Sequence, residues 1–293
     1  MNFNLPDNYP STVDLPFNRA SLDTHFQLST ADRDPGTPGV WLILQGSALL
    51  IKETTSGPQL PEGDSPILTS VHPPLYIGDW QEQPCRVLKI ARQAELPPDF
   101  QTISLQDRNP QLPLTLLSLA GIAQMILHWE KTSQRCGHCG EQLVRLPGEW
   151  GKKCHSCDSQ HFPHIHPCVI GLIVRGKEIL LVRKPEWADG RFGLVAGFVE
   201  FGESLEEAME REIREETGLQ VNHLRYVGSQ CWPFPSQLMT GFVADYLAGD
   251  IKLQEDELAE AAWYKLDQLP VLPPRRSIAR YLIDRAGEYL QNH

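Results

Sequence analysis

The stretch GFVEFGESLEEAMEREIREETGL, residues 197–219, concentrates eight glutamates in a short segment of the chain. Ser204 followed by Glu207 forms a capping box, which marks a helix N-terminus. Gly218 suits the position just past a helix C-terminus, because it adopts a left-handed backbone without strain. The sequence therefore predicts a helix over residues 205–217.

The helical period sorts the charges of this segment onto different faces. At about 100° per residue, one side of the helix is polar throughout and is predicted to face solvent. This polar side carries Glu206, Glu207, Glu210 and Arg214, whereas the apolar stripe carries Leu205, Ala208, Met209 and Ile213. A second group of carboxylates is predicted to lie beside or over the apolar stripe, namely Glu212, Glu215 and Glu216.

A solvated face explains the first group of glutamates but not the second. Three carboxylates that lie together beside the apolar stripe would repel one another, and their partial burial would remove some of their hydration. Divalent cations would relieve both penalties, and hard oxygen ligands with room for water favour Mg²⁺ or Mn²⁺, the ions of phosphate chemistry. We expect Glu212, Glu215 and Glu216 to bind such ions, with Arg211 beside Glu215 orienting the acidic network.

The same stretch resembles the Nudix box at every specified position. The matching residues are Gly197, Glu203, Arg211, Glu212, Ile213, Glu215, Glu216, Gly218 and Leu219. This resemblance implies an α/β/α sandwich with a mixed sheet, in which a loop–helix–loop forms a metal platform. It also implies hydrolysis of a nucleoside diphosphate linked to another group, by attack of water on phosphorus. Glu216 is then also the expected base, Glu203 assists from the loop, and the carbonyl of Ala196 completes the metal site.

A second motif, SQCWPFPSQLM over residues 229–239, holds two large aromatic residues between prolines. By itself it could be a hydrophobic turn packed in a core, but its flat faces also suit bases or a nicotinamide ring. It is similar to the SQPWPFPxS signature of the NADH pyrophosphatase branch. Cys231 replaces the first proline, and Gln237 stands where the last serine would be. The implied substrate contacts are Gln230, Cys231, Trp232, Pro233, Phe234, Pro235, Ser236 and Gln237.

The branch resemblance extends to further positions. Phe198 matches an aromatic that stacks on nicotinamide, and Phe162 replaces the tyrosine that is its usual partner. Glu257, or alternatively Glu260, matches a further metal carboxylate. Substrate contacts are also implied at Glu149 and Ala279.

Two CxxC pairs, at 136–139 and 154–157, predict a four-sulfur zinc site. Two-residue spacing lets both thiolates of a pair point at one ion, and four protein ligands make the site structural. Disulfides or redox pairs are weaker alternatives, and His138 or His155 could compete as ligands. The expected zinc ligands are Cys136, Cys139, Cys154 and Cys157.

The chain of 293 residues is long enough for more than one domain. Strand-like runs separated by turn-rich stretches predict a mostly β N-terminal domain without recognisable chemistry. A hairpin is expected around Gly176-Lys177, and a connecting helix over LTLLSLAGIAQMILHWEKT. The predicted divisions are 1–108 for the N-terminal domain, 109–133 for the linker and helix, 134–163 for the zinc ribbon and 164–293 for the Nudix domain.

Composition narrows the expected location and partners. The net charge of −11 disfavours general nucleic-acid binding. The apolar run over 114–127 is too short and too polar to span a bilayer, and residues 1–18 lack the pattern of a signal peptide. We therefore expect a cytoplasmic protein that does not bind membranes.

The combined resemblance implies cleavage of NAD(H) to NMN(H) and AMP by a homodimer that shares residues across its active sites. Removal of an NAD cap from RNA is a further implied activity. One alternative is a Nudix hydrolase of another nucleotide, such as ADP-ribose or a dinucleoside polyphosphate. Another is a silent nucleotide sensor or a zinc-ribbon protein that binds RNA.

Overall fold

A computed structural model describes residues 5–290, which divide into two compact units. The first unit contains residues 19–165 and 233–236, and the second contains residues 5–18, 166–232 and 237–290. Residues 5–18 thus belong to the second unit, although the chain that follows them belongs to the first. Residues 233–236 belong to the first unit, although the residues on either side of them belong to the second. No helix within the described range is long and apolar enough to cross a membrane.

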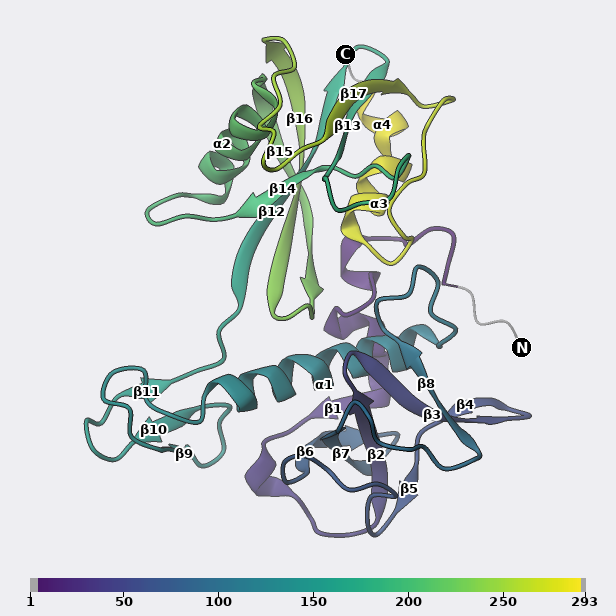
Figure 1. The fold of residues 1–293 in the computed structure, drawn as a ribbon, viewed down its shortest axis with the longest axis vertical. Coiled ribbons are helices and arrows are strands. Elements are labelled where there is room, and N and C mark those ends of the chain that lie inside the picture. The colour runs from purple at the N-terminus through teal and green to yellow at the C-terminus, as the bar shows by residue number, and fades with distance from the viewer. Residues whose placement is uncertain (1–4, 291–293) are drawn as a thin grey trace. The chain divides into compact units, whose positions relative to one another are not determined.

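An eight-stranded sheet forms most of the first unit (Figure 1). Its main path is β1-β6-β7-β2-β3-β4, with β5 on β2 and β8 on β3. The strands are β1 (Phe26–Leu28), β2 (Gly39–Gln45), β3 (Ala48–Thr54), β4 (Gly57–Gln59), β5 (Glu62–Gly63), β6 (Leu75–Trp80), β7 (Gln83–Ile90) and β8 (Phe100–Ser104). Short 3-10 helices lie at η2 (Arg19–His25) and η3 (Ala31–Arg33) in this unit, whereas η1 (Thr12–Asp14) belongs to the second unit. The predicted mostly β character of this region is confirmed.

The predicted connecting helix is α1 (Leu114–Thr132), and the cysteine pairs follow it in a small separate sheet. This three-stranded sheet has the order β11-β10-β9. Its strands are β9 (Leu143–Arg145), β10 (Lys152–Cys154) and β11 (Gln160–His161).

The second unit is built on a mixed six-stranded sheet with the order β15-β16-β12-β13-β17, in which β14 also pairs with β12. Strands β12 and β16 run parallel, and the other pairs are antiparallel. The strands are β12 (His166–Arg175), β13 (Glu178–Arg183), β14 (Val195–Phe198), β15 (Gln220–Trp232), β16 (Gln237–Ala248) and β17 (Glu260–Lys265). The β12–β13 hairpin at Gly176-Lys177 is confirmed.

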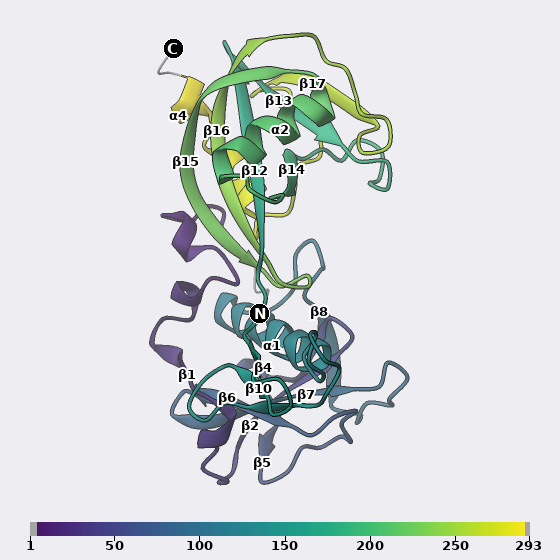
Figure 2. The same ribbon diagram turned by 90° about the vertical axis from the view of Figure 1, so that its left-hand side faces the viewer.

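Helices cover both faces of this sheet. Helix α2 (Leu205–Thr217) packs Met209 and Ile213 against Val169 and Ile173, which share one face of β12 because side chains alternate along a strand. Helices α3 (Ile278–Asp284) and α4 (Ala286–Leu290) contact β12 from the other side. Figure 2 shows α2 in front of the sheet. The α/β/α sandwich is therefore confirmed.

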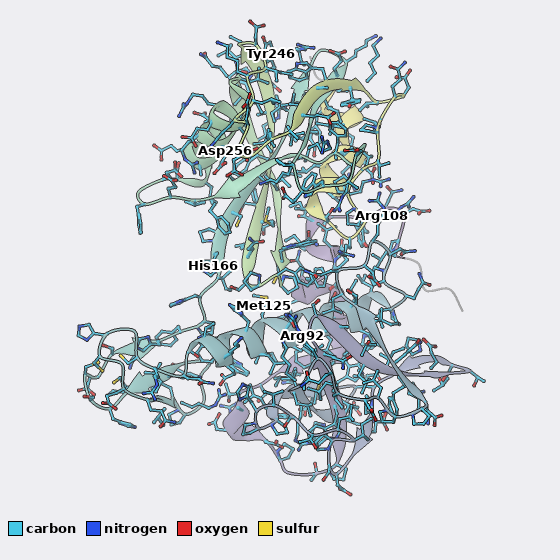
Figure 3. All side chains as sticks on the ribbon, viewed as in Figure 1. Arg92, Arg108, Met125, His166, Tyr246 and Asp256 are labelled. Carbon is cyan, nitrogen blue, oxygen red and sulfur yellow. The ribbon has the colours of Figure 1, made fainter. Side chains whose placement is uncertain are left out.

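Strand β14 and the loop that follows it lie at one end of this sheet. His166 begins β12, and Tyr246 lies near the far end of the parallel strand β16, as Figure 3 shows. Strand β14 pairs with β12 at the His166 end, where Phe198 is opposite Cys168. The loop that leads into α2 therefore starts at this end of the sheet.

Candidate functional site

Local sequence signals position helix α2. The backbone N–H of Glu207 donates to Ser204 Oγ at 3.1 Å, and the backbone N–H of Ser204 donates to Glu207 Oε2 at 2.8 Å. Gly218 ends the helix with a left-handed φ of 74°. The predicted capping box, helix bounds and C-terminal glycine are all confirmed, so the register of the glutamates is fixed by these ends.

The glutamates of α2 fall into the two predicted groups, with one difference. The residues of the polar side, Glu206, Glu207, Glu210 and Arg214, are exposed. In the second group, Glu216 is 3% exposed and the Glu212 side chain is 13% exposed. The Glu215 side chain is 51% exposed, because it projects further from the apolar stripe than its neighbours do.

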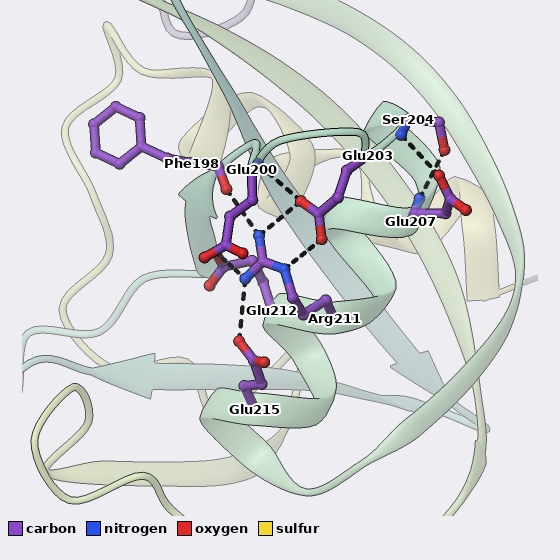
Figure 4. Close-up of polar contacts among 8 residues, drawn as sticks. All are labelled: Phe198, Glu200, Glu203, Ser204, Glu207, Arg211, Glu212 and Glu215. Atoms are coloured by element: carbon purple, nitrogen blue, oxygen red, sulfur yellow. Dashed lines mark hydrogen bonds and ion pairs between the residues drawn. The ribbon is translucent and has the colours of Figure 1, made fainter.

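Arg211 connects the acidic side chains of the box (Figure 4). Its Nη1 donates to Glu212 Oε1 at 2.8 Å and to Glu215 Oε2 at 3.1 Å. Its Nη2 donates to the carbonyl of Phe198 at 2.9 Å and to Glu203 Oε2 at 3.0 Å. One guanidinium thus holds three carboxylates and the end of β14 in a fixed arrangement.

The Glu203 carboxylate contacts Arg211 and its own loop. Arg211 is the main cause that lowers the pKa of Glu203 to about 2. The other Glu203 contact is the backbone N–H of Glu200, which donates to Oε2 at 2.9 Å. Glu203 does not line the cavity described below, so its contacts orient Arg211 and the loop.

Glu216 carries a buried oxygen atom, Oε2, without a hydrogen-bond partner among the described residues. Burial raises its pKa to about 7, opposed by the positive charge of Lys184 and reinforced by Glu212 and Glu257. Burial also raises the pKa of Glu212, although Arg211 opposes the shift. A buried, unpaired carboxylate is costly, and a divalent cation would satisfy it. The donor set therefore fits a hard cation.

These carboxylates open into a cavity of about 680 Å³, within the usual size of a ligand pocket. Its acidic lining residues are Glu200, Glu212, Glu215, Glu216 and Glu257. Its other lining includes the aromatic residues Trp187, Phe198 and Trp232, and the basic residues Lys184, Arg191 and Arg276. Acidic, basic and flat apolar groups in one cavity suit a ligand that carries both phosphates and rings.

The end of β15 forms one wall of this cavity. The Gln230 amide donates to the carbonyls of Pro16 at 2.9 Å and Arg276 at 2.7 Å, and it accepts from the N–H of Ile278 at 2.7 Å. The Trp232 ring lies 5.9 Å from the Arg276 guanidinium. Long-range hydrogen bonds of the Gln230 side chain to backbone groups thus fix the wall in place.

Not all the residues predicted for the site meet in this cavity. Ala196, Phe198, Gln230, Trp232, Gln237 and Ala279 line it together with the acidic group. Cys231 is half-buried beside it and is not part of the lining. Glu149, Phe162, Pro233, Phe234, Pro235 and Ser236 belong to the first unit.

The two alternatives for a further metal carboxylate differ in position. Glu257 lines the cavity, with Oε2 at 3.7 Å from Lys184 Nζ. Glu260 lies outside the lining and forms an ion pair with Arg183 at 2.5 Å. The geometry therefore favours Glu257.

Three basic residues and one aromatic residue of the lining were not predicted from the sequence, namely Lys184, Arg191, Arg276 and Trp187. Lys184 directly follows β13, and side chains at strand ends often reach a site, so its position after a predicted strand could have indicated it. Arg276 gives no comparable signal, because only the tertiary fold brings it to Trp232.

The four cysteines in and around the small sheet come together as predicted. Their sulfur atoms all lie within 4.8 Å of one another, with 3.6 Å between Cys136 and Cys157 and 3.4 Å between Cys139 and Cys154. Tetrahedral zinc bound at 2.3 Å per sulfur requires about 3.8 Å between sulfurs. A disulfide needs about 2.05 Å, so the sulfur positions fit zinc and not disulfides.

Family comparisons match three parts of the chain. Residues 38–129 match an NADH pyrophosphatase-like rudimentary NUDIX domain, residues 131–162 an NADH pyrophosphatase zinc ribbon domain, and residues 164–286 a NUDIX domain. A protein of Pseudomonas fluorescens Pf-5 named NAD-capped RNA hydrolase NudC is 38% identical over 269 residues, covering 87% of this chain and 92% of the relative. The chain belongs to the NADH pyrophosphatase branch of the Nudix hydrolases.

A second relative agrees with this placement. An Escherichia coli O157:H7 protein, also named NAD-capped RNA hydrolase NudC, is 40% identical over 210 residues, covering 72% of this chain and 79% of the relative. The resemblance first seen in the box and the WPFP motif is confirmed. In this Nudix hydrolase the four-cysteine cluster is a structural zinc site within a zinc ribbon.

Proposed function

We propose that this Nudix hydrolase cleaves the pyrophosphate of NAD(H) to NMN(H) and AMP, and that it removes the NAD cap from RNA to leave a 5′-monophosphate. The observation that carries the proposal is the buried, unpaired oxygen of Glu216, in a cavity shared with other carboxylates and aromatic rings. The relatives named NAD-capped RNA hydrolase support the choice of substrate.

Catalysis depends on Mg²⁺ or Mn²⁺ in this proposal. Glu212, Glu215, Glu216 and Glu257 would hold these ions together with the carbonyl of Ala196. When bound, the ions neutralise phosphate charge and make water a stronger nucleophile. Zinc in the ribbon has no open position and stays structural.

The side chains of the box have two further roles in this proposal, to accept a proton and to position the other groups. The water oxygen forms a bond to one phosphorus, the bridging P–O bond breaks with its electron pair on the leaving phosphate, and the proton of the water passes to Glu216. Arg211 keeps Glu212 and Glu215 in position, and Glu203 in turn holds Arg211. Because these groups are already oriented, little reorganisation is needed during the reaction.

The rings of the substrate contact the aromatic part of the cavity. Phe198 is 53% exposed, so its face is open for stacking on nicotinamide, with Phe162 as the proposed partner. Further proposed contacts come from Glu149, Gln230, Cys231, Trp232, Pro233, Phe234, Pro235, Ser236, Gln237 and Ala279. The protein acts in this proposal as a cytoplasmic homodimer that shares residues between its active sites.

One assay tests the proposal. The purified full-length chain is incubated with NADH, with ADP-ribose and with NAD-capped RNA, each with and without Mn²⁺. We expect Mn²⁺-dependent release of AMP and NMNH from NADH, and a 5′-monophosphate on the RNA. Glu216→Gln should abolish turnover, whereas the matched control Glu210→Gln, on the exposed side of the same helix, should leave it unchanged.

The other outcomes identify the alternatives. Equal or faster cleavage of ADP-ribose than of NADH would mean a Nudix hydrolase of another nucleotide. Nucleotide binding without any AMP in the presence of Mn²⁺ would mean a sensor. Both outcomes overturn the proposed substrate or activity.

A further inference from the structure

An N-terminal segment far from the Nudix box packs on the substrate wall of the second unit. We propose that Phe17 and Asn18, in the strap Thr12–Asn18, are positioning residues that hold Trp232 and the end of β15 for substrate binding. The inference rests on the proposed function. It goes beyond that function because the strap precedes all three regions matched by the family models.

The Asn18 side chain bonds the strap to β15. Its Nδ2 donates to the carbonyl of Thr12 at 2.8 Å and to the carbonyl of Ser229 at 3.1 Å. Its Oδ1 accepts from the backbone N–H of Cys231 at 2.7 Å. One amide thus satisfies two backbone groups of β15 on either side of Gln230 and also closes the strap on itself.

Phe17 is held in an unfavourable backbone conformation beside Trp232. Its φ of 72° is rare for a bulky residue and strained, yet its side chain is only 1% exposed. Its ring meets the Trp232 ring edge-on, with 5.7 Å between centroids and 89° between planes. The strained backbone directs this ring against the tryptophan that lines the cavity.

Two further contacts fix the register of the strap. The carbonyl of Pro16 accepts from the Gln230 amide at 2.9 Å. Thr12 fills the space that a Cβ on Gly228 would occupy, so glycine at 228 is required for this close approach. The strap therefore contacts β15 at successive positions from 228 to 232.

The residues just before the strap contact Arg275 and Arg285 near the C-terminal end of the second unit. Arg285 Nη2 donates to the carbonyls of Tyr9 and Pro10, each at 3.1 Å. Asp7 forms an ion pair with Arg275, the neighbour of the cavity residue Arg276. These contacts attach the start of the strap to the C-terminal part of the second unit.

Asn18→Ala tests the positioning role, with Asn222→Ala as the control. Asn222 lies on β15 but outside the cavity lining and outside residues 228–232, which the strap contacts. In the full-length protein, Asn18→Ala should raise KM for NADH about tenfold with kcat within about twofold, because uniform substrate binding is lost. Asn222→Ala should leave both constants unchanged. An unchanged KM, or a kcat that falls in parallel with the fraction of folded protein, would overturn the proposal.

A double-mutant cycle separates positioning from general stability. If the strap acts through Trp232, Asn18→Ala should change KM little once Trp232→Ala is present. Independent, additive effects of the two substitutions on KM would contradict this. Phe17→Leu, which keeps a buried side chain but removes the ring edge, should reproduce the KM effect of Asn18→Ala.

Fluorescence of Trp232 tests whether the strap positions this residue, even if NADH is not the substrate. The emission of Trp232 is obtained as the difference between the parent and Trp232→Phe, and Asn18→Ala should shift this difference to longer wavelength. An unshifted difference spectrum overturns the strap alone. Absence of NADH hydrolysis in the parent overturns the proposed function alone.

Discussion

Glu216 shows how a functional requirement opposes stability at a single residue. Its buried Oε2 has no hydrogen-bond partner among the described residues, and burial raises its pKa to about 7. A glutamine of the same shape would avoid the charge at little steric cost. The carboxylate is retained, we infer, because its cost disappears when a cation binds.

Glu216→Gln should therefore stabilise the protein in the absence of Mg²⁺ and Mn²⁺. Because the pKa of Glu216 rises on folding from 4.5 to about 7, its contribution to stability is greatest below pH 4.5 and is lost as the pH rises through 7. At pH 8 the substitution should increase the free energy of unfolding by roughly 3 kcal/mol at most, with little effect at pH 4.5.

Thermal unfolding of zinc-loaded protein measures this, with Glu210→Gln as the exposed control. Mn²⁺ should then raise the Tm of the parent and not that of Glu216→Gln, since only the parent binds the ion tightly. A parent that is more stable than Glu216→Gln at pH 8 without Mn²⁺ would contradict the expected cost of burial.

At the scale of elements, the parts that could be predicted are those with local causes. The bounds of α2 follow from Ser204, Glu207 and Gly218, which act within a few residues of the helix ends. The β12–β13 hairpin and α1 follow from similarly short patterns. The wall at Trp232 was only partly predictable, because Arg276 and the strap reach it through contacts across more than two hundred residues or through the tertiary fold.

The junction of β14 and α2 gives a prediction for a pair of elements. A Cβ at Gly197 would overlap the Glu212 carboxyl group. Gly197→Ala should thus displace this carboxylate and lower kcat/KM for NADH by at least about 100-fold, since small misplacements of catalytic groups have effects of this size. The helix and sheet should remain folded by circular dichroism.

Gly202→Ala is the matched control for Gly197→Ala. Gly202 lies in the loop between β14 and α2 with a φ of 85°, and a Cβ there meets nothing within 4 Å. Backbone strain alone should cost about 1 kcal/mol or somewhat more, with activity largely kept. Equal losses of activity in the two variants would contradict the role given to the displaced Glu212 carboxylate.

At the scale of the whole molecule, the net negative charge opposes the binding of the proposed substrates. The chain carries a net charge of −11, yet its proposed substrates are anions. Lys184, Arg191 and Arg276 gather in the cavity and oppose this charge locally. Divalent cations on Glu212, Glu215, Glu216 and Glu257 would complete the local reversal of charge, which agrees with the dependence on Mg²⁺ or Mn²⁺ proposed above.

Zinc should stabilise one part of the molecule and not the other. Cys154 is fully buried in the ribbon beside Cys136 and Leu143, so Cys154→Ser removes both a ligand and a core contact. We expect this variant to lose its zinc, measured by mass spectrometry, and to lose amide protection in the ribbon strands. Protection of the β12–β17 sheet should stay unchanged.

Cys85→Ser is the control, since Cys85 is equally buried but belongs to the eight-stranded sheet. It should keep zinc while losing about 1–3 kcal/mol from its buried hydroxyl; a zinc content that stays at the parental level in Cys154→Ser would contradict the assigned ligand set.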